Sequence, residues 1–204
     1  MALVYDSGRH QYLNDGNPVP WSSVSNALEK HRALLAVRIE ELTASLTQQT
    51  ISAPSWRDGM RTAIKDAYIS HYLAGRGGRN NMRPSDWGRI GGLLSSQYRY
   101  LNNFVNDILA GDMSEAAIVA RARLYIESAT QAAERAKAAD RGLVLPAYPG
   151  DGTSECMANC KCEWSLIELD TRWEATWRLS AAEHCQTCIE RARLWAPLII
   201  EKDL

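Results

Sequence analysis

The chain has 204 residues, a formal net charge of −1 and 46% hydrophobic residues. This composition is typical of a globular protein with a core of its own, not of a disordered chain. The near-neutral charge gives no overall attraction to nucleic acid or to anionic membranes. No apolar stretch approaches the ~18 residues that would span a bilayer, and the N-terminus lacks the pattern of a secretion signal. We therefore expect no membrane association and a protein that is made in a reducing cytoplasm.

Residues 1–23 are predicted to form a short β-ribbon that serves as a strap. Asp15-Gly16 is a strong hairpin-turn signal, and it follows the run HQYL. Pro18 and Pro20 restrict the returning segment to an edge strand or an extended arm. Because a pair of strands is only marginally stable alone, we expect the ribbon to lean on a larger part of the molecule.

Residues 24–140 are predicted to form a helical bundle, since apolar side chains recur at spacings of three, four and seven. Short connections between long amphipathic helices favour an antiparallel arrangement. The first helix is expected after a capping serine (Ser22, Ser23 or Ser25), the second from Ser52, the third from a cap at Ser85, and the fourth from Ser114 to about Asp140. The fold class is therefore mainly α.

Positive charge is concentrated between Arg57 and Arg99, where eight lysines and arginines stand against three aspartates. Such an excess is usually the solvated face of a helix, but a surface that contacts phosphates needs the same excess. Four arginines are the candidate nucleic-acid contacts: Arg76, Arg79, Arg83 and Arg89. A zinc-containing nucleic-acid-binding module that uses this basic face is the alternative function.

Residues 141–155 contain two prolines and three glycines and are predicted to link the bundle to a C-terminal unit, residues 156–204. That unit contains two segments, CKCEWSLIEL and RWEATWRL, in which large apolar residues and cysteines recur at every second position, as in strands. The two predicted strands are joined around Asp170-Thr171. The chain is then expected to turn at Ser180 into a helix. The sequence thus predicts a small β-hairpin followed by a helix.

All five cysteines lie in this unit, as Cys156-x3-Cys160-x-Cys162 and His184-Cys185-x2-Cys188. The predicted hairpin and helix bring the two groups together, and tetrahedral zinc takes four thiolate or imidazole ligands as two chelating pairs. We predict one structural zinc ion held by four of the five thiols. Cys185 and Cys188 are favoured, with two of Cys156, Cys160 and Cys162, while His184 is spare or lies beside the ligands. Disulfides and buried free thiols are the alternatives.

Signals for catalysis are weak. Glu183 beside His184 and Cys185 is similar to part of a zinc-deaminase signature, but the order lacks that signature's glutamate position and its proline. The stretch GRGGR lacks both the Gly-Lys-Ser/Thr ending and the preceding strand of a phosphate-binding loop. We therefore predict that the chain is not an enzyme, with a zinc hydrolase or deaminase kept only as a third hypothesis.

Four stretches resemble the minor head, or head-morphogenesis, proteins of tailed bacteriophages and prophages: YDSGRHQYLNDGNPVPWSSV, DWGRIGGLLSSQYRYLNNFVNDILAG, YPGDGTSECMANCKCEW and AEHCQTCIERARLWAPL. The family's Gln-Tyr-x-Tyr-Leu-x-x-Phe helix is matched at residues 97–104. Its Asn-Cys-Arg-Cys and Glu-His-Cys-x-x-Cys knuckles are matched at residues 159–162 and 183–188, although here the knuckles come in the reverse order.

The resemblance implies a virion protein that is assembled in the bacterial cytoplasm and present in a few copies near the portal or inside the head. It implies contacts with portal or capsid proteins that aid assembly or DNA delivery, and no catalytic residues. Packaged DNA and further copies of the chain, as a homo-oligomer, are the additional candidate partners.

Overall fold

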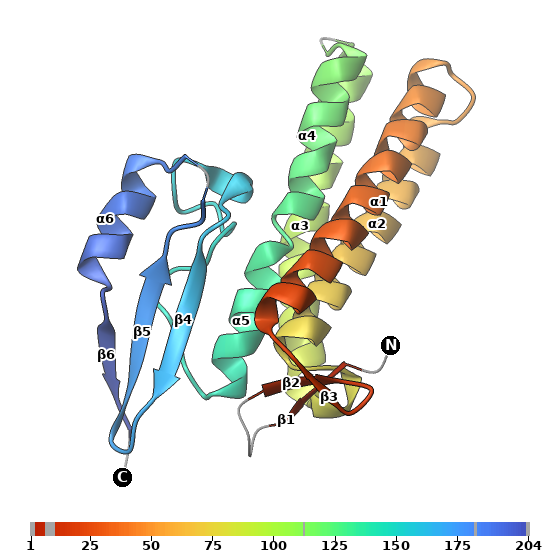
Figure 1. The fold of residues 1–204 in the computed structure, drawn as a ribbon. Coiled ribbons are helices and arrows are strands. Elements are labelled where there is room, and N and C mark those ends of the chain that lie inside the picture. Colours follow the sequence, from red (N-terminus) through yellow and green to blue (C-terminus); the bar gives the residue numbers. More distant parts are fainter. Residues whose placement is uncertain (1–2, 7–10, 112, 182, 203–204) are drawn as a thin grey trace.

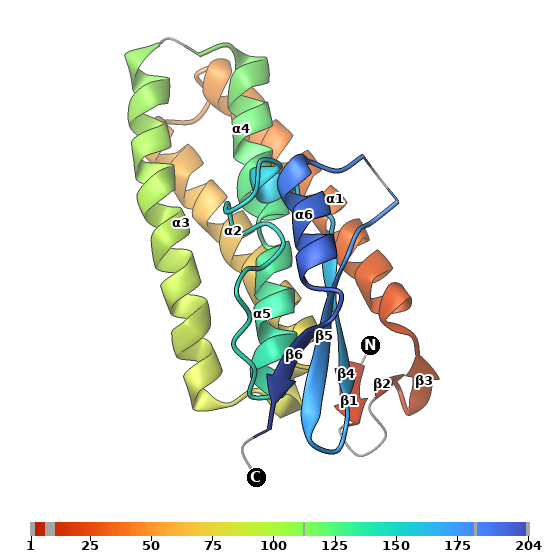
Figure 2. The same cartoon turned by 90° about the vertical axis from the view of Figure 1, so that its left-hand side faces the viewer.

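The computed structural model is mainly helical, with two small antiparallel sheets of three strands each (Figure 1). It describes residues 3–6, 11–111, 113–181 and 183–202. The long helices lie side by side, the N-terminal sheet lies at one end of them, and the C-terminal sheet flanks them (Figures 1 and 2). Among the described residues, none of the helices combines the length and hydropathy needed to cross a lipid bilayer.

The central helix is α2 (Ala53–Gly75), which contacts α1 (Trp21–Thr47), α3 (Pro84–Ala110), α4 (Glu115–Glu127) and α5 (Thr130–Asp140). The larger apolar side chains that recur along it at helical spacing are all buried: Trp56, Met60, Ile64, Ala67, Tyr68 and Tyr72. These side chains join buried residues of the other four helices in one core cluster. Burial of apolar surface is therefore what holds the helical region together.

Two predicted helix starts are wrong. α1 begins at Trp21, directly after Pro20 and without a side-chain cap, so no serine at 22, 23 or 25 caps it. α3 begins at Pro84, and the Asp86 carboxylate accepts a hydrogen bond from the Arg83 N–H at 2.9 Å. Proline suits the first turn of a helix because its fixed φ is already helical and its missing N–H would be unpaired there.

The other two starts follow the sequence signals, since the side chains of Ser52 and Ser114 each accept a backbone hydrogen bond at 3.3 Å. The helix that starts at Ser114 does not continue to Asp140, because α4 ends at Glu127 and α5 begins at Thr130. The Ser128 hydroxyl lies at this break, 2.8 Å from the Tyr68 hydroxyl of α2. A tertiary contact thus accompanies an interruption that no glycine or proline marks.

α5 approaches α2 very closely at Gly75. A Cβ atom at this position would lie 2.3 Å from the carbonyl oxygen of Ala133 and 2.7 Å from the Cβ of Ala136. Only glycine fits without a backbone shift, because real Cβ atoms do not approach so near. The alanines of α5 complete the contact by adding little bulk.

The N-terminal sheet has the order β1 (Leu3–Asp6), β2 (Gln11–Asn14) and β3 (Asn17–Val19). Its predicted hairpin is present, with φ of 49° at Asp15 and 84° at Gly16. β1 was not predicted. The Tyr12 ring packs at a tilt against Trp21 of α1, with ring centroids 5.2 Å apart, and its hydroxyl donates to the Gly75 carbonyl at 3.3 Å. The ribbon therefore leans on the helices, as a marginal sheet must.

The C-terminal sheet contains β4 (Glu163–Glu168), β5 (Arg172–Arg178) and β6 (Leu198–Glu201). The predicted hairpin is present as β4 and β5, whereas β6 was not predicted. The helix of this unit, α6, spans Gln186–Leu194 and begins later than the predicted turn at Ser180. Three indole rings pack together with centroids 5.2 to 5.8 Å apart: Trp164, Trp177 and Trp195.

The predicted linker, residues 141–155, contains no helix or strand but is well packed. Leu143, Leu145 and Tyr148 are buried in the same cluster as the tryptophans and cysteines of the sheet. The Trp164 indole N–H donates to the Ala147 carbonyl at 2.9 Å. This segment is therefore part of the C-terminal core, and not a loose tether.

Candidate metal centre

The two cysteine groups meet near the start of β4 and of α6. Cys156 precedes a short 3-10 turn, η2 (Met157–Asn159), and Cys160 follows it before the chain enters β4. Cys185 is the residue directly before α6, and Cys188 lies in its first turn. Of the cysteines, Cys160, Cys162 and Cys188 are buried, at 2%, 3% and 1% exposure.

Three of the sulfur separations are close to those within a tetrahedral thiolate site. The Cys156 sulfur lies 3.6 Å from the Cys185 sulfur and 3.7 Å from the Cys188 sulfur. The sulfurs of Cys160 and Cys188 are 3.6 Å apart. An ion with metal–sulfur bonds of about 2.3 Å holds its sulfurs about 3.8 Å apart. A disulfide needs about 2.05 Å, and all five cysteines are free. Cys156, Cys160, Cys188 and their neighbours can therefore hold a metal ion.

The cluster stabilises negative charge on the Cys160 sulfur, whereas the pKa values of Cys156, Cys162 and Cys188 are raised. Hydrogen bonding by the Cys162 side chain, with further hydrogen bonds from its backbone, Cys188 and Cys156, lowers the pKa of Cys160 to about 5 despite burial. Burial raises the pKa of Cys188. A thiolate surrounded by thiols is well placed to bind a metal, since the thiolate form is the ligand.

His184 lies beside Cys162. Its Nε2 is 2.9 Å from the Ser180 carbonyl oxygen, which can only accept a hydrogen bond, so Nε2 carries the proton and donates. Its Nδ1 lies 4.0 Å from the Cys162 sulfur. Metal-bound histidines commonly donate their other ring N–H to a carbonyl in this way.

Two residues that support the site were not identified from the sequence. The Glu155 carboxylate accepts a hydrogen bond from the Gln186 N–H at 3.1 Å and so caps the start of α6. The Ser154 hydroxyl lies 3.2 Å from the Cys156 sulfur. The one signal in the sequence is that both directly precede the first cysteine.

The four arginines of the predicted basic face differ in exposure. Arg76 is only 2% exposed and forms ion pairs with Asp86 at 3.0 Å and Asp140 at 2.6 Å, so its assignment as a nucleic-acid contact is wrong. Arg79 and Arg83 are exposed near the turn between α2 and α3. Arg89 is exposed as well, but it pairs with Asp86 at 3.1 Å.

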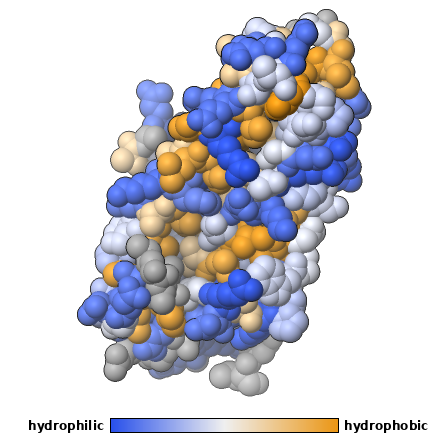
Figure 3. Space-filling view, turned by 90° about the vertical axis from the view of Figure 1, so that its right-hand side faces the viewer, coloured by the Kyte–Doolittle hydropathy of each residue, from blue (hydrophilic) through white to orange (hydrophobic). Residues whose placement is uncertain are grey.

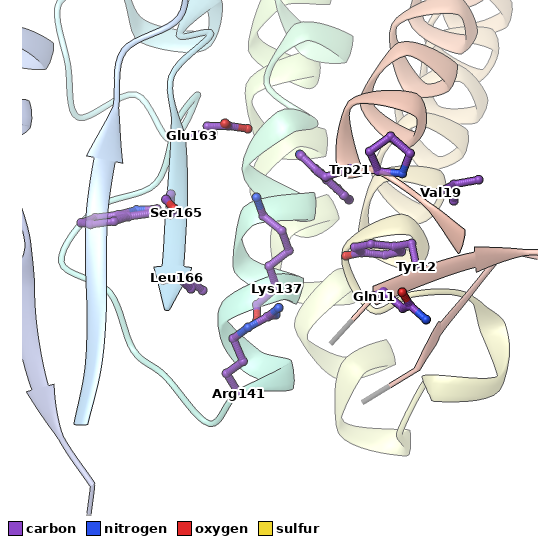
Figure 4. A pocket seen from close by; sticks show the side chains of 11 residues that line it. Gln11, Tyr12, Val19, Trp21, Lys137, Arg141, Glu163, Ser165 and Leu166 are labelled. Atoms are coloured by element: carbon purple, nitrogen blue, oxygen red, sulfur yellow. The ribbon is translucent and has the colours of Figure 1, made fainter. Parts of the chain in front are cut away.

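A pocket of about 360 Å³ lies between the N-terminal sheet, α5 and β4 (Figure 4). Figure 4 shows Lys137 of α5 between the two sheets, and its ammonium lies 4.6 Å from the centre of the Trp21 ring. Lys137 also pairs with the buried Glu134 at 2.5 Å, and Glu134 accepts a hydrogen bond from the Trp164 N–H at 3.0 Å. This chain of contacts joins the N-terminal ribbon, α5 and the C-terminal sheet.

No protein-family model, curated protein or solved structure matches the chain.

Proposed function

We propose that the chain is a phage virion assembly protein of the minor-head class, in which a zinc ion closes the C-terminal unit against a bundle of antiparallel helices. The observation that carries the proposal is the set of sulfurs 3.6 to 3.7 Å apart between β4 and α6. The phage assignment rests on the resemblance of residues 97–104 and of the two cysteine knuckles to that family.

Zinc is the ion that suits these donors best, because soft thiolates in a tetrahedral arrangement favour zinc. We assign Cys156, Cys160, Cys185 and Cys188 as its ligands. Structural zinc sites have four protein ligands, whereas a catalytic site keeps one position open to water. Cys160 and Cys188 are almost fully buried, which supports a structural role.

Protein contact is the activity that the helical surface favours. Leu34 and Val37 on α1 are 70% and 52% exposed. Figure 3 shows the side of the molecule that includes α1, where apolar side chains gather in patches between charged ones. Apolar patches with polar surroundings are typical of sites of protein association.

Cosedimentation with the portal and capsid proteins of the phage or prophage that encodes the chain tests this part of the proposal. We expect association, and we expect the double variant Leu34→Asp, Val37→Asp to lose it. Leu109→Asp is the matched control, because Leu109 is 67% exposed on another helix, α3. Failure of the unmodified chain to associate with either protein under assembly conditions would overturn the head-assembly role.

DNA contact is the second candidate, because Arg79, Arg83 and Arg89 are exposed together at the α2–α3 end of the molecule. Binding to duplex DNA is expected to weaken steeply with salt, and each lost phosphate contact changes the log–log salt slope by about 0.9. The triple alanine variant of these arginines should flatten that slope. A triple variant of Arg38, Arg123 and Arg178, also exposed, is the control. No binding at low salt would remove this candidate.

A further inference from the structure

A cavity of about 440 Å³ lies between α3, α5 and the start of the segment 141–155, on the face of the molecule that Figure 2 shows. Its volume falls within the range of about 300–1,000 Å³ that is typical of small-molecule sites. Among the described residues that line it, only Arg89 of α3 and Arg135 of α5 are charged. The cavity is therefore suited to a negatively charged ligand.

The charge of Arg135 is not compensated by the described part of the chain. Its Nε is buried without a hydrogen-bond partner, and its side chain forms no ion pair with a described residue. Its guanidinium lies over the Tyr148 ring, 4.3 Å from the ring centre, and this contact orients it. A buried polar group without a partner costs free energy, so an anion in the cavity would stabilise this side chain.

Arg89 supplies a second guanidinium from a different helix. It donates to Asp86 at 3.1 Å, but its side chain is 55% exposed, and Asp86 is shared with the buried Arg76 at 3.0 Å. A guanidinium has five N–H donors, so the contact with Asp86 leaves others for a ligand. Two guanidiniums therefore line one cavity from two sides.

Gly92 keeps the α3 side of the cavity open. A Cβ atom at this position would meet nothing within 4 Å, so packing within the chain does not require glycine there. Glycine inside a helix is destabilising relative to alanine. Gly92 lines the cavity, and any larger side chain at this position would occupy space that a ligand could use.

We propose that this cavity binds a small phosphate monoester through the guanidiniums of Arg89 and Arg135. A phosphate monoester carries a charge of about −1.5 to −2 at pH 7, and its three terminal oxygens can accept hydrogen bonds from two guanidiniums at once. A carboxylate has only two oxygens and a single charge. The organic part of the ligand lies against an apolar wall made by Leu93, Leu143 and Val144. This inference is independent of the metal site and of the virion role.

Calorimetric titration of the full chain with adenosine monophosphate tests the inference, since this probe joins a phosphate monoester to a flat base. We expect saturable binding of one equivalent, weaker binding of inorganic phosphate and no measurable binding of adenosine. Arg89→Ala and Arg135→Ala should each weaken binding about tenfold or more, because each removes charge-assisted hydrogen bonds. Arg99→Ala is the matched control, since Arg99 is also an exposed arginine of α3 beside a tyrosine ring, but does not line the cavity.

Gly92→Leu tests the cavity without removing a charge. The leucine side chain should fill the cavity and weaken binding of adenosine monophosphate by about tenfold or more. Gly88→Leu is the matched control, because Gly88 also lies in α3 with open space around it but does not line the cavity. Both variants should unfold at a temperature no lower than the unmodified chain, since leucine is a better helix former than glycine.

Four outcomes would overturn the site. One is the absence of saturable binding of adenosine monophosphate at millimolar concentration. Another is binding of adenosine as tight as that of its monophosphate, which would show that the phosphate is not recognised. An equal loss in Arg99→Ala would show general attraction to positive charge. Binding of a 5′-phosphorylated oligonucleotide without binding of the monophosphate would assign these arginines to nucleic acid instead.

Discussion

The helical region and the C-terminal unit are stabilised by different means. In the helical region, large side chains from α1, α2, α3 and α4 are fully buried, among them Trp56, Tyr68 and Phe104, and α5 adds buried alanines. The C-terminal unit packs a few tryptophans against its cysteines and the segment 141–155. A unit of about fifty residues rarely buries enough apolar surface for independent stability. Burial suffices in the first region, whereas we expect the second to depend on the metal ion proposed for its cysteine cluster.

Removal of metal should have the largest effect on stability, and it should unfold the C-terminal unit while the helical region stays folded. Chelation is expected to unfold the C-terminal unit, since structural zinc contributes roughly 10 kcal/mol or more in small metal-dependent domains. Tryptophan fluorescence should shift to the red because Trp164, Trp173, Trp177 and Trp195 become exposed. Far-UV circular dichroism should retain most of its helical signal. Added zinc should reverse the fluorescence change. If the helical circular dichroism signal were lost together with the fluorescence signal, the two regions would not differ in their dependence on metal.

Trp56→Ala should damage the helical region and spare the metal site. Trp56 is fully buried, packs edge-on against Phe104 at 5.5 Å and donates its indole N–H to the Thr43 hydroxyl at 3.2 Å. Truncation of a buried tryptophan costs about 3–5 kcal/mol. Urea unfolding followed by circular dichroism measures the loss, with unchanged metal content as the second expectation. Trp87→Ala is the control, because Trp87 is 41% exposed.

Asp86→Asn should cost about 3 kcal/mol at neutral pH, since it removes one partner of a buried ion pair. Burial alone would raise the pKa of Asp86, but the Arg83 N–H, the Tyr72 hydroxyl and the Arg76 guanidinium outweigh it and lower the pKa. The carboxylate therefore stabilises the fold above the ordinary aspartate pKa of 3.8, and this contribution is lost as the pH falls below it.

Urea unfolding of the helices at pH 7 and near pH 3 measures this dependence. The stability difference between the wild-type chain and Asp86→Asn should narrow at the lower pH. Asp58→Asn is the control, because Asp58 pairs with Arg57 but is 63% exposed. A difference that stays constant with pH would mean that the Asp86 charge is not what stabilises this contact.

Arg123→Ala should have the smallest effect. Arg123 pairs with Glu40 between α4 and α1, but the two side chains are 49% and 41% exposed. Exposed ion pairs contribute about 0.2–1 kcal/mol, and salt screens them. Thermal unfolding in low and high salt should show a small difference from the wild-type chain that vanishes at high salt. A loss of stability as large as that of Asp86→Asn would mean that this exposed ion pair contributes as much as the buried one.

The spacing of apolar residues was enough to predict the long helices and the β4–β5 hairpin, because burial imposes periods of 3.6 and 2 on the sequence. The ends of these elements were less predictable. Pro20 and Pro84, and not nearby serines, mark the starts of α1 and α3. β1 and β6 are four residues each, too short for their alternation to stand out.

The candidate site was predictable in composition and not in arrangement. The clustering of five cysteines indicated a metal site, but only the folded chain shows which sulfurs are neighbours. Arg76 was wrongly grouped with exposed arginines because one of its partners, Asp140, is 64 positions away in the sequence. Sequence spacing does not report such contacts, and exposure is the default expectation for an arginine.

α5 contributes to the cores of both the helical region and the C-terminal unit, so the chain cannot be cut between them without loss of contacts. One side of this helix packs on α2 through Ala132 and Ala136, while Ala138 belongs to the C-terminal core. A chain cut after Asp140 would leave Glu134 without its hydrogen bond from the Trp164 N–H and would expose that side of α5. Recombination that joined this C-terminal unit to a different helical partner would have to bring α5 with it. The smallest C-terminal segment that keeps these contacts therefore begins at Thr130, well before the first cysteine.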